Sequence, residues 1–559
     1  MRIWLIAAVA ALTACATASA PHIDTTAVPA FAHASLSPDA LVGHVNVLAS
    51  DEFEGRAPGT HGEVLTLAYI QRAFTAIGLA PGATNADGSH SFLQEVPLTA
   101  ALVDNAPSFN VSGADGARAY TFGNQFVGWT KRVQENTSIE NAPLVFVGYG
   151  IVAPEHNWND YAGVDMHGKI AVILINDPDY ETNDDRGFGG RAMTYYGRWT
   201  YKYEEAARQG AAGAIIIHET GPAAYPWSVV QSSNTTQQFD VVHDDNAMSR
   251  VPVEGWVTSD VGHELFSRAG LDFDALKARA QTQGFRPVAM GSLRGAITLH
   301  TQIQHTHSYN VIGVLAGLQA PNEAVIYSAH WDHLGRCTPV NGDNICNGAL
   351  DNATGVSGLI ELARHYVEHG AGRRSVAFLA VTGEEKGLLG SRYYSDHPTF
   401  QPGNIVANIN MDGLSVYGPS RDLTIISYGK SEMDDLVDAA TRAQGRRIRP
   451  DAFPERGSFF RSDQFNFARI GVPVLYTGSG IDLVNGGEER GRALVNDYVA
   501  HRYHSPQDQV SPDWDMSGAT QDLNVLYDVG RGLAQGSSWP AWRPNAEFRA
   551  ARQATHPSP

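Results

Sequence analysis

The second half of the chain alternates between two hydrophobic patterns. From residue 308 onward, short runs rich in Val and Ile are separated by segments whose apolar residues recur every three or four positions. The clearest helical segments are 355–369 and 430–444. This alternation predicts an α/β fold with a mostly parallel mixed sheet flanked by helices. The predicted strands are 309–315, 323–330, 375–385, 405–413, 423–429 and 472–480.

The first half of the chain has a different texture. Residues 35–80 follow the helical period, with Thr60 placed to cap a helix and Gly78 to end one. From about residue 106 to 290, strand-like runs alternate with Gly, Asn and Asp turns, and one helical segment covers 201–211. Because this block has apolar runs of its own, we expect it to be an inserted, β-rich domain.

Length and charge narrow the possibilities. A chain of 559 residues is too long for one ordinary hydrophobic core, so we expect two domains. The formal net charge of -19 at pH 7 repels phosphate backbones and argues against a nucleic acid partner. The polar end of the chain is expected to be a flexible tail. We therefore expect five segments. They are an N-terminal segment 1–20, the first part of the main domain 21–105, the inserted domain 106–290, the α/β part of the main domain 291–545 and the tail 546–559.

The first 20 residues have the features of an export signal. Arg2 supplies a positive start, residues 3–12 are apolar, and small residues follow. Two processing sites remain open: ASA at 18–20 fits signal cleavage, whereas LTAC at 12–15 resembles a lipoprotein box in which Cys15 would carry a lipid. Either site predicts an exported protein, periplasmic or extracellular. In the second case it would be an outer-membrane lipoprotein, held to the membrane only by that N-terminal lipid.

Two further cysteines, Cys337 and Cys346, flank the segment TPVNGDNI, which is rich in turn-forming residues. In an oxidising compartment such a pair is expected to close a small disulfide loop. The alternatives are two free thiols or a pair of soft metal ligands, although the spacing is wider than the C-x-x-C of zinc sites.

Histidines and carboxylates follow the ends of the predicted strands. Ligand sites in open α/β sheets lie beyond the carboxyl ends of the strands, so these residues should share one rim of the sheet. Imidazole nitrogen and carboxylate oxygen are ligands for zinc and similar divalent ions. The set exceeds the needs of one zinc ion and suits two ions about 4 Å apart that share a carboxylate. The residues are His330, Asp351, Glu384, Glu385, Asp412 and His504.

Each of these residues alone has an ordinary explanation. Asp351 could cap the helix that follows it, Asp412 could belong to an Asp-Gly turn, and His504 could lie in a surface loop. Adjacent glutamates are usually a solvated face, but on an extended backbone they point in opposite directions. One of Glu384 and Glu385 can therefore bind metal while the other acts as a general base. Their joint placement at consecutive strand ends favours the metal site.

These residues lie in motifs that resemble those of the M28 family of zinc-dependent exopeptidases, which includes bacterial leucyl aminopeptidase and glutamate carboxypeptidase II. The block 106–290 resembles a protease-associated (PA) domain, an insertion common in this family. The resemblance implies the zinc exopeptidase fold, of the phosphorylase/hydrolase-like type, for 291–545. The matching motifs are HWD at 330–332, LDNATG at 350–355, TGEEKGLLGS at 382–391, NMDG at 410–413, FRSDQFNFARIGVP at 460–473 and YHSPQD at 503–508.

The resemblance implies a centre of two Zn²⁺ ions, for which Co²⁺ or Mn²⁺ could substitute. Asp351 would bridge both ions. His330 and Asp412 would complete one site, and Glu385 and His504 the other.

The resemblance also implies roles for three neighbours of the metals. Glu384 would be the general base that takes a proton from the attacking water and returns it to the leaving amine. Asp332 would orient His330. Tyr503 matches a tyrosine that donates a hydrogen bond to the oxyanion in some family members, and the alternative for it is core packing.

The function implied is that of an exported aminopeptidase acting on peptides, since the loop from His330 to Asp351 is longer than we expect in the carboxypeptidase branch. The alternative is a carboxypeptidase or dipeptidase for acidic peptides, whose basic pocket could use Arg456 or Arg461. A third interpretation is a non-catalytic binding protein on the same fold, which would predict a broken ligand set. The aromatic segment 191–206 could line the cleft entrance or form the core of its own block.

Overall fold

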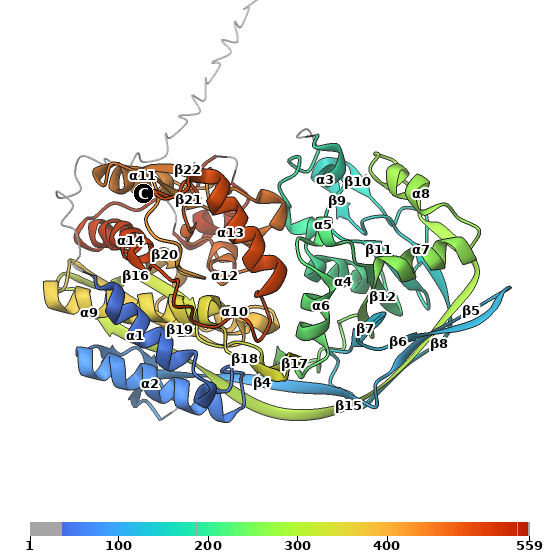
Figure 1. The fold of residues 1–559 in the computed structure, drawn as a ribbon, viewed down its shortest axis with the longest axis horizontal. Coiled ribbons are helices and arrows are strands. Elements are labelled where there is room, and N and C mark those ends of the chain that lie inside the picture. The colour runs from blue at the N-terminus through green and yellow to red at the C-terminus, as the bar shows by residue number, and fades with distance from the viewer. Residues whose placement is uncertain (1–35, 86, 185–186, 545, 557–559) are drawn as a thin grey trace, which may run out of the picture.

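The computed structural model describes residues 36–85, 87–184, 187–544 and 546–556. They form two lobes that lie side by side (Figure 1). We name them the main lobe, residues 36–104 and 300–556, and the insert lobe, residues 105–299. Each lobe has its own hydrophobic core.

Four parallel strands form the centre of the main-lobe sheet, in the order β19–β16–β20–β23. The end of β15 and strand β21 flank them in antiparallel orientation, and β22 pairs with β21. Every strand predicted from the apolar runs is present, and the mostly parallel mixed sheet is confirmed. The bounds are β15 Val288–Leu315, β16 Ala320–His330, β19 Arg374–Val381, β20 Ile405–Asn410, β21 Asp422–Ile425, β22 Arg447–Pro450 and β23 Val474–Gly478, with β1 Ala80–Pro81 at the edge.

Side chains of the central strands alternate between two cores. In β16, Val325, Tyr327 and Ala329 lie in the core covered by helices α9 and α14. Ala324 and Ile326 face the opposite core, beneath α10 and α12. Helices α1 and α2 pack on the outside of α9. Both faces of the sheet are therefore buried, which explains why its strands read as continuous apolar runs.

The ends of helix α2 follow the predicted capping signals. The Thr60 hydroxyl accepts from the amide of Glu63, and Gly78 ends the helix at φ 91°, a left-handed conformation that glycine adopts without steric strain. The main-lobe helices are α1 Pro38–Leu48, α2 His61–Ile77, α9 Thr354–His369, α10 Leu389–Asp396, α11 Met433–Ala443, α12 Gln464–Arg469, α13 Gly487–His501, α14 Ser517–Gln535 and α15 Arg549–Thr555.

The insert lobe is a mixed α/β unit. Strands β8, β11, β12 and β14 run parallel in that order, and β7 pairs antiparallel with β14. The predicted helical segment falls in α4, and α6, α7 and α8 are further helices that the sequence analysis did not predict. These helices have only 8 to 10 residues, too few to give a clear helical period. The bounds are β5 Ser108–Gly113, β6 Gly116–Thr121, β7 Phe126–Trp129, β8 Asn136–Phe146, β11 Ile170–Leu174, α3 Asp179–Thr182, α4 Trp199–Arg208, β12 Gly213–Ile217, α5 Thr220–Ala223, α6 Trp227–Asn234, β13 Gln238–Val241, β14 Glu254–Val257, α7 Ser259–Arg268 and α8 Phe273–Ala280.

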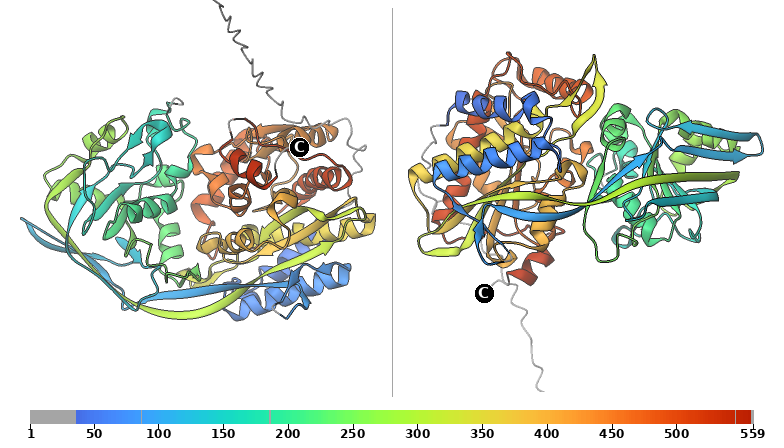
Figure 2. Two further views of the ribbon diagram at one scale, coloured as in Figure 1. Left: turned by 180° about the vertical axis from the view of Figure 1, so that it is seen from behind. Right: turned by 90° about the horizontal axis from the view of Figure 1, so that it is seen from below.

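Two long strands belong to both lobes. Strand β4 (Leu93–Asp104) pairs antiparallel with β15 along its whole length, and the first half of β15 then pairs with β8 and β5 of the insert lobe. Figure 2 shows this ribbon passing without a break from one lobe to the other. The boundary expected after residue 105 coincides with the end of β4, but the one expected after 290 falls inside β15. A single strand serves both lobes there, so no linker marks the change.

Half of the expected flexible tail, residues 549–555, is helical. These residues form helix α15, and the buried Arg552 donates to the carbonyl oxygens of Pro402 and Ile405. The predicted signal segment 1–20 and the lipoprotein box at Cys15 lie outside the described residues. Among the residues that the structure describes, no helix is both long and apolar enough to span a lipid bilayer.

A disulfide joins Cys337 to Cys346. It links strand β17 (Gly335–Val340) to β18 (Asp343–Cys346), which pair as a hairpin. Gly55, at φ 71°, lies against this hairpin, where a Cβ atom would come within 2.4 Å of the Cys346 carbonyl oxygen. This close backbone approach, which only glycine allows, holds the hairpin against the N-terminal part of the main lobe.

Candidate metal centre

The six strand-end residues predicted as a metal site meet at one rim of the main-lobe sheet. His330 is the last residue of β16, the glutamate pair forms the short turn after β19, and Asp412 follows β20. Asp351 precedes α9, and His504 follows α13 with a left-handed φ of 56°. Parallel strands place their carboxyl ends at the same edge, and this brings residues far apart in sequence into one cluster.

Asp351 lies at the centre of the cluster, with one carboxylate oxygen turned to each histidine. Its Oδ1 is 3.3 Å from His330 Nε2, and its Oδ2 is 3.4 Å from His504 Nε2. Asp412 Oδ1 is 3.3 Å from the same His330 nitrogen. Glu385 Oε2 is 2.9 Å from the His504 nitrogen. The five residues therefore form two groups of nitrogen and oxygen donors that share Asp351.

The spacing of these donors fits two divalent ions. Two ligand atoms held about 2.1 Å from a common tetrahedral ion lie about 3.4 Å apart. Three of the four distances above are close to that value and are longer than a charge-assisted hydrogen bond of about 2.7–2.9 Å. Among the described residues, the group His330, Asp351 and Asp412 could hold one metal ion, and the group His333, Asp351 and Glu385 another.

Hydrogen bonds fix which nitrogen each histidine presents to the cluster. His330 Nδ1 lies 3.1 Å from the backbone oxygen of Asp332, which can only accept, so this nitrogen carries the proton. His504 Nδ1 contacts the hydroxyl of Ser233 at 3.0 Å. Both rings therefore turn Nε2 toward the carboxylates, the orientation in which a neutral imidazole binds metal.

The cluster holds more carboxylates than the side chains around it can balance. Burial alone would lower the pKa of His330 and of His504, but the surrounding acids outweigh it. The pKa of His330 is raised well above its usual value by Glu384 and Asp412, and that of His504 is raised to about 9 by Glu385 and Asp351. A field this negative is one that divalent cations would neutralise.

Glu384 lies beside the donor groups rather than among them. Its backbone amide donates to Asp332 Oδ1 at 3.1 Å, and its side chain lines the cleft. Burial raises the pKa of Glu384 well above its usual value, with His330 opposing the shift. A basic carboxylate that faces the cleft can accept a proton from a bound water.

Asp332 contacts both sides of the cluster. Its carboxylate is 3.9 Å from His330 Nδ1, farther than its own backbone oxygen, and it also accepts from the Glu384 amide. It therefore orients the histidine mainly through its backbone. Burial raises the pKa of Asp332 to about 7.

Tyr503 lies between the cleft and a core of the insert lobe. Its ring lies 3.9 Å from the ring of His504 and packs against an insert-lobe core. Its hydroxyl lines the cleft and accepts from Arg461 Nη2 at 3.3 Å. Because Arg461 supplies the donor in that contact, the phenol proton remains free to be donated.

His333 is a member of the cluster that the sequence analysis missed. It is fully buried, and its Nδ1 lies 2.5 Å from Glu385 Oε1. With Asp351 and Glu385 it forms the second of the two groups around Asp351 that could hold a cation. The sequence did offer a reason to consider His333, because it directly follows the HWD motif.

Two more residues hold the loop that carries Asp351. Asp508 is buried, and its two carboxylate oxygens accept from the amides of Leu350 and Asp351, each at 3.0 Å. Arg56 is buried beneath the loop and donates to the Asn347 and Gly348 carbonyls among others. Asp508 ends the YHSPQD motif, whereas nothing in the local sequence singles out Arg56.

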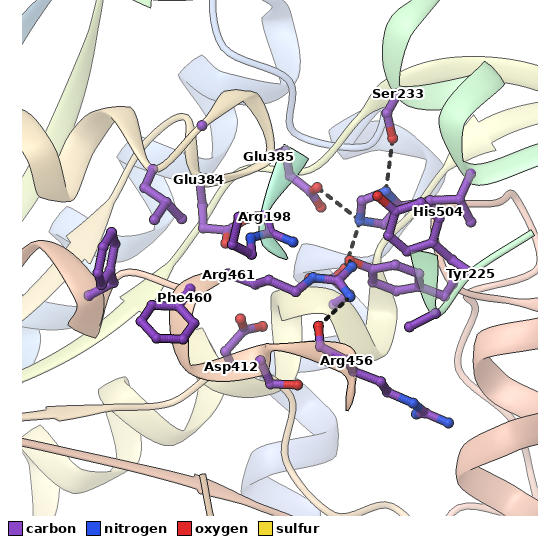
Figure 3. A pocket seen from close by; sticks show the side chains of 18 of the residues that line it. Arg198, Tyr225, Ser233, Glu384, Glu385, Asp412, Arg456, Phe460, Arg461 and His504 are labelled. Atoms are coloured by element: carbon purple, nitrogen blue, oxygen red, sulfur yellow. Dashed lines mark hydrogen bonds and ion pairs between the residues drawn. The ribbon is translucent and has the colours of Figure 1, made fainter. Parts of the chain in front are cut away.

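The cluster opens into a cleft of about 430 Å³ between the two lobes. Figure 3 shows Glu384, Glu385 and Asp412 on its main-lobe side. Residues of the insert lobe also line the cleft, including Arg198 and Tyr225. The aromatic segment 191–206 divides between the two roles considered for it, since Tyr195, Arg198 and Trp199 line the cleft while Tyr203 is buried in the lobe.

The insert lobe also holds one of the candidate ligands in place. Ser233, on α6, contacts His504 Nδ1, and the hydroxyl of the neighbouring Ser232 donates to the His504 backbone oxygen at 3.1 Å (Figure 3). We expect Ser233→Ala to weaken binding of one metal equivalent by about 10-fold or more, because the imidazole loses the partner that fixes its orientation. Competition with a chromogenic chelator measures this affinity. Ser228→Ala, an exposed position on the same helix, is the matched control; equal affinities in both variants would contradict the prediction.

The comparisons with known proteins agree with this geometry. Residues 310–527 match peptidase family M28. The chain is 22% identical over 383 residues to a glutamate carboxypeptidase 2 homolog of Caenorhabditis elegans, an alignment that covers 60% of this chain and 45% of that protein. It is 24% identical over 277 residues to a probable leucine aminopeptidase 2 of Aspergillus fumigatus, covering 48% and 51%. In both cases the match spans about half of the relative's length.

The fold of the whole described chain also has a counterpart among solved structures. The aminopeptidase from Aneurinibacillus sp. strain AM-1 superposes with a TM-score of 0.51 at 18% identity, covering 91% of this chain and 95% of that one. The match in sequence coincides with the part of the main lobe that carries the strand-end cluster. Residues 310–527 of this chain are therefore a peptidase family M28 domain.

Proposed function

We propose that this chain is an exported di-zinc aminopeptidase, which hydrolyses N-terminal residues from peptides. The observation that carries the proposal is the position of Asp351, whose two oxygens face the Nε2 atoms of His330 and His504. A shared carboxylate between two sets of nitrogen and oxygen donors is the arrangement that a pair of metal ions requires. Several relatives bear the name of a zinc metalloprotease or an aminopeptidase.

In this proposal two Zn²⁺ ions would be held by these donors: His330 and Asp412 on one side, Glu385 and His504 on the other, with Asp351 available to both. Zinc, when bound, lowers the pKa of water toward neutrality and stabilises negative charge on a peptide carbonyl oxygen. Co²⁺ or Mn²⁺ would be tolerated by the same nitrogen and oxygen donors.

The chain's own residues supply proton transfer and orientation. Glu384 accepts the proton of the attacking water and passes it to the leaving amine. Asp332 keeps the proton of His330 on Nδ1 through its backbone oxygen and holds the Glu384 amide through its side chain. Tyr503, whose hydroxyl already accepts from Arg461, donates its own proton to the oxygen that becomes negative during attack.

The proposal is tested with two kinds of substrate. Aminoacyl-p-nitroanilides carry a free amine, and N-blocked dipeptides carry only a free carboxylate. We expect cleavage of the free-amine substrates, complete loss with a chelator, and recovery with Zn²⁺, Co²⁺ or Mn²⁺, because the metal would supply the activation of water that the side chains alone do not. Cleavage that survives thorough chelation would contradict a metal-dependent mechanism.

A carboxypeptidase or dipeptidase of the glutamate carboxypeptidase type is the second candidate. It is favoured by one observation: the basic side chains of Arg198, Arg456 and Arg461 line the cleft. Cleavage of N-blocked substrates alone would establish it. Full metal binding without hydrolysis of either substrate class would favour the third candidate, a binding protein on this fold.

Export is also part of the proposal. It is supported by the Cys337–Cys346 disulfide, since such bonds persist in oxidising compartments. Fractionation of expressing cells, with the mass of the mature N-terminus, separates cleavage after Ala20 from lipidation at Cys15. A full-length product in the cytoplasm would contradict export.

A further inference from the structure

A further group of histidines and a carboxylate lies at the carboxyl end of helix α9. His365, Glu368 and His369 belong to its last turn, and each offers a ligand atom within 4.8 Å of the others. Helix α9 begins at Thr354, close to Asp351, and its rise places His365 about 16 Å from that first residue. Figure 1 shows α9 near the edge of the main lobe that is farthest from the insert lobe. The group is therefore distinct from the strand-end cluster.

Hydrogen bonding leaves one nitrogen of His369 free to bind a ligand. Its Nδ1 lies 2.9 Å from the backbone oxygen of His365, which can only accept, so Nδ1 carries the proton. Nε2 then keeps its lone pair, and the residue is exposed. Metal-binding histidines are commonly held in this way, with the other ring nitrogen donating to a backbone oxygen. His330 of the strand-end cluster makes the same kind of contact.

His365 is buried without a hydrogen-bond partner for its Nδ1. Only 2% of its surface is exposed, and this nitrogen contacts no donor or acceptor among the described residues. The centre of its ring lies 3.9 Å from that of His369, and the ring of Tyr527 meets it edge-on at 4.5 Å. Burial lowers the pKa of His365 to about 4, so its imidazole is neutral at neutral pH. A buried polar nitrogen without a partner is costly, and packing against Tyr527 does not satisfy it.

Glu368 can turn from an arginine to a bound cation at little cost. Its carboxylate pairs with Arg364 Nη1 at 2.6 Å, and half of its side chain is exposed. Exposed ion pairs of this kind contribute little to stability. Arg364 also holds Glu361 at 2.8 Å, so it keeps an anionic partner when Glu368 moves away.

The charges around the group do not exclude a cation. Arg531, on α14, donates to the backbone oxygens of His369 and Gly370, and Arg364 is the other arginine close by. The two glutamates that pair with Arg364 match these two arginines in number. The carboxyl end of a helix adds partial negative charge, which favours a cation in the last turn.

We propose that His365, Glu368 and His369 form a further metal site, which binds a divalent transition ion such as Zn²⁺, Cu²⁺ or Ni²⁺. Side chains three and four positions apart share one face of a helix, so the three residues can converge on one ion. Two imidazoles and a carboxylate are donors that these ions prefer, whereas Mg²⁺ and Ca²⁺ prefer oxygen alone. An ion that joins positions 365 and 369 crosslinks the last turn of α9 and holds it in the helix. The inference does not depend on the proposed function.

The number of bound zinc ions tests the site. Protein stripped with a chelator is dialysed against Zn²⁺, and the equivalents bound to wild type and to His369→Gln are compared. We expect the variant to bind one equivalent fewer, whatever number the strand-end cluster holds. Loss of an outer partner costs about 10- to 100-fold in metal affinity, so Glu368→Gln should weaken this equivalent by at least as much. Equal numbers and affinities in wild type and both variants would overturn the site. Both residues are exposed, so these substitutions should leave the fold intact.

His397→Gln is the matched control. The Nδ1 of His397 also contacts the backbone oxygen four positions before it, at 3.3 Å, and its ring stacks on that of Tyr393. The surroundings of His397 thus resemble those of His369, with a tyrosine in place of His365. The control should bind as many equivalents as wild type. A loss equal to that in His369→Gln would show that exposed histidines bind zinc without a built site, and would contradict the inference.

Hydrogen exchange locates the bound ion. In wild type, Zn²⁺ should slow the exchange of the backbone amides of residues 366–370, and this protection should be absent in His369→Gln. It should persist in Glu385→Gln, which is expected to lose metal from the strand-end cluster, so the two sites are tested separately. Protection confined to the surroundings of Asp351 would overturn the inference. Equal protection by Mg²⁺ would contradict histidine ligands.

Discussion

Replacing Glu384 with glutamine is expected to lower kcat by about 10²- to 10⁴-fold, the usual contribution of a general base. The amide has nearly the same shape but cannot accept the proton of the attacking water. Glu384 has no side-chain contact within the donor groups, so metal content should stay at the wild-type value. Steady-state kinetics and metal analysis of the same preparation measure both quantities.

The neighbouring glutamate gives a matched control. Glu385 Oε2 is 2.9 Å from His504 Nε2, within the donor group, so Glu385→Gln should lose metal as well as activity. The two variants thus differ by one position and are expected to differ in metal content. Loss of metal in Glu384→Gln, or full metal content in Glu385→Gln, would reverse the roles that we assign to the pair.

Replacing Arg56 with methionine is expected to destabilise the main lobe by about 3 kcal/mol or more. The buried guanidinium donates to four carbonyl oxygens, those of Leu48, Trp331, Asn347 and Gly348, at 2.6–2.9 Å. Methionine fills much of the volume but leaves these oxygens without donors, and each unsatisfied group is costly in a dry interior. The substitution also removes a positive charge near Asp351, Asp332 and Glu385.

The unfolding temperature of the metal-free protein measures this effect most directly. Without metal, the acids of the cluster depend on Arg56 for part of their neutralisation, so the loss should be larger than in the metal-bound protein. Arg72→Met, at an exposed arginine on α2, is the control and should change the unfolding temperature little. An equally small change in Arg56→Met would show that the loop before Asp351 does not depend on this residue.

The fold and the candidate site of the main lobe could be predicted from sequence, because several of the site residues directly follow the ends of its strands. His330 closes β16, and Glu384 and Asp412 follow β19 and β20, so the rule for parallel sheets was enough to bring them together. His504 lies at the end of a loop rather than a strand. Its place was inferred from its motif, and the structure puts it 3.4 Å from Asp351.

The contributions of the insert lobe could not be predicted in this way. Ser233 contacts His504 across 271 positions of the chain, and Arg198 lines the same cleft as Arg461. Such contacts depend on how the two lobes pack, and neither serine nor arginine stands out in its local sequence. Helices α6, α7 and α8 of this lobe were not predicted either, because 8 to 10 residues form too few turns to show a helical period.

The end of the chain was misjudged from composition alone. The segment 546–559 is polar, and polar ends are commonly loose. The side chain of Arg552 nevertheless holds this segment against the main lobe, because it donates to two backbone oxygens there. A long polar side chain can be buried when it finds such acceptors, and composition does not reveal whether it will.

The ribbon of β4 and β15 determines how this enzyme can open. Proteins that close around a ligand usually rotate two bodies about a few residues of irregular backbone. Here the bodies share two hydrogen-bonded strands, so rotation would have to bend a paired sheet along its length. Large rotations of one lobe relative to the other are therefore disfavoured, and the distance between the lobes should vary little. A bulky ligand could not be admitted by a transient opening, so the size of any ligand that enters the cleft is set by the distance between the lobes at rest.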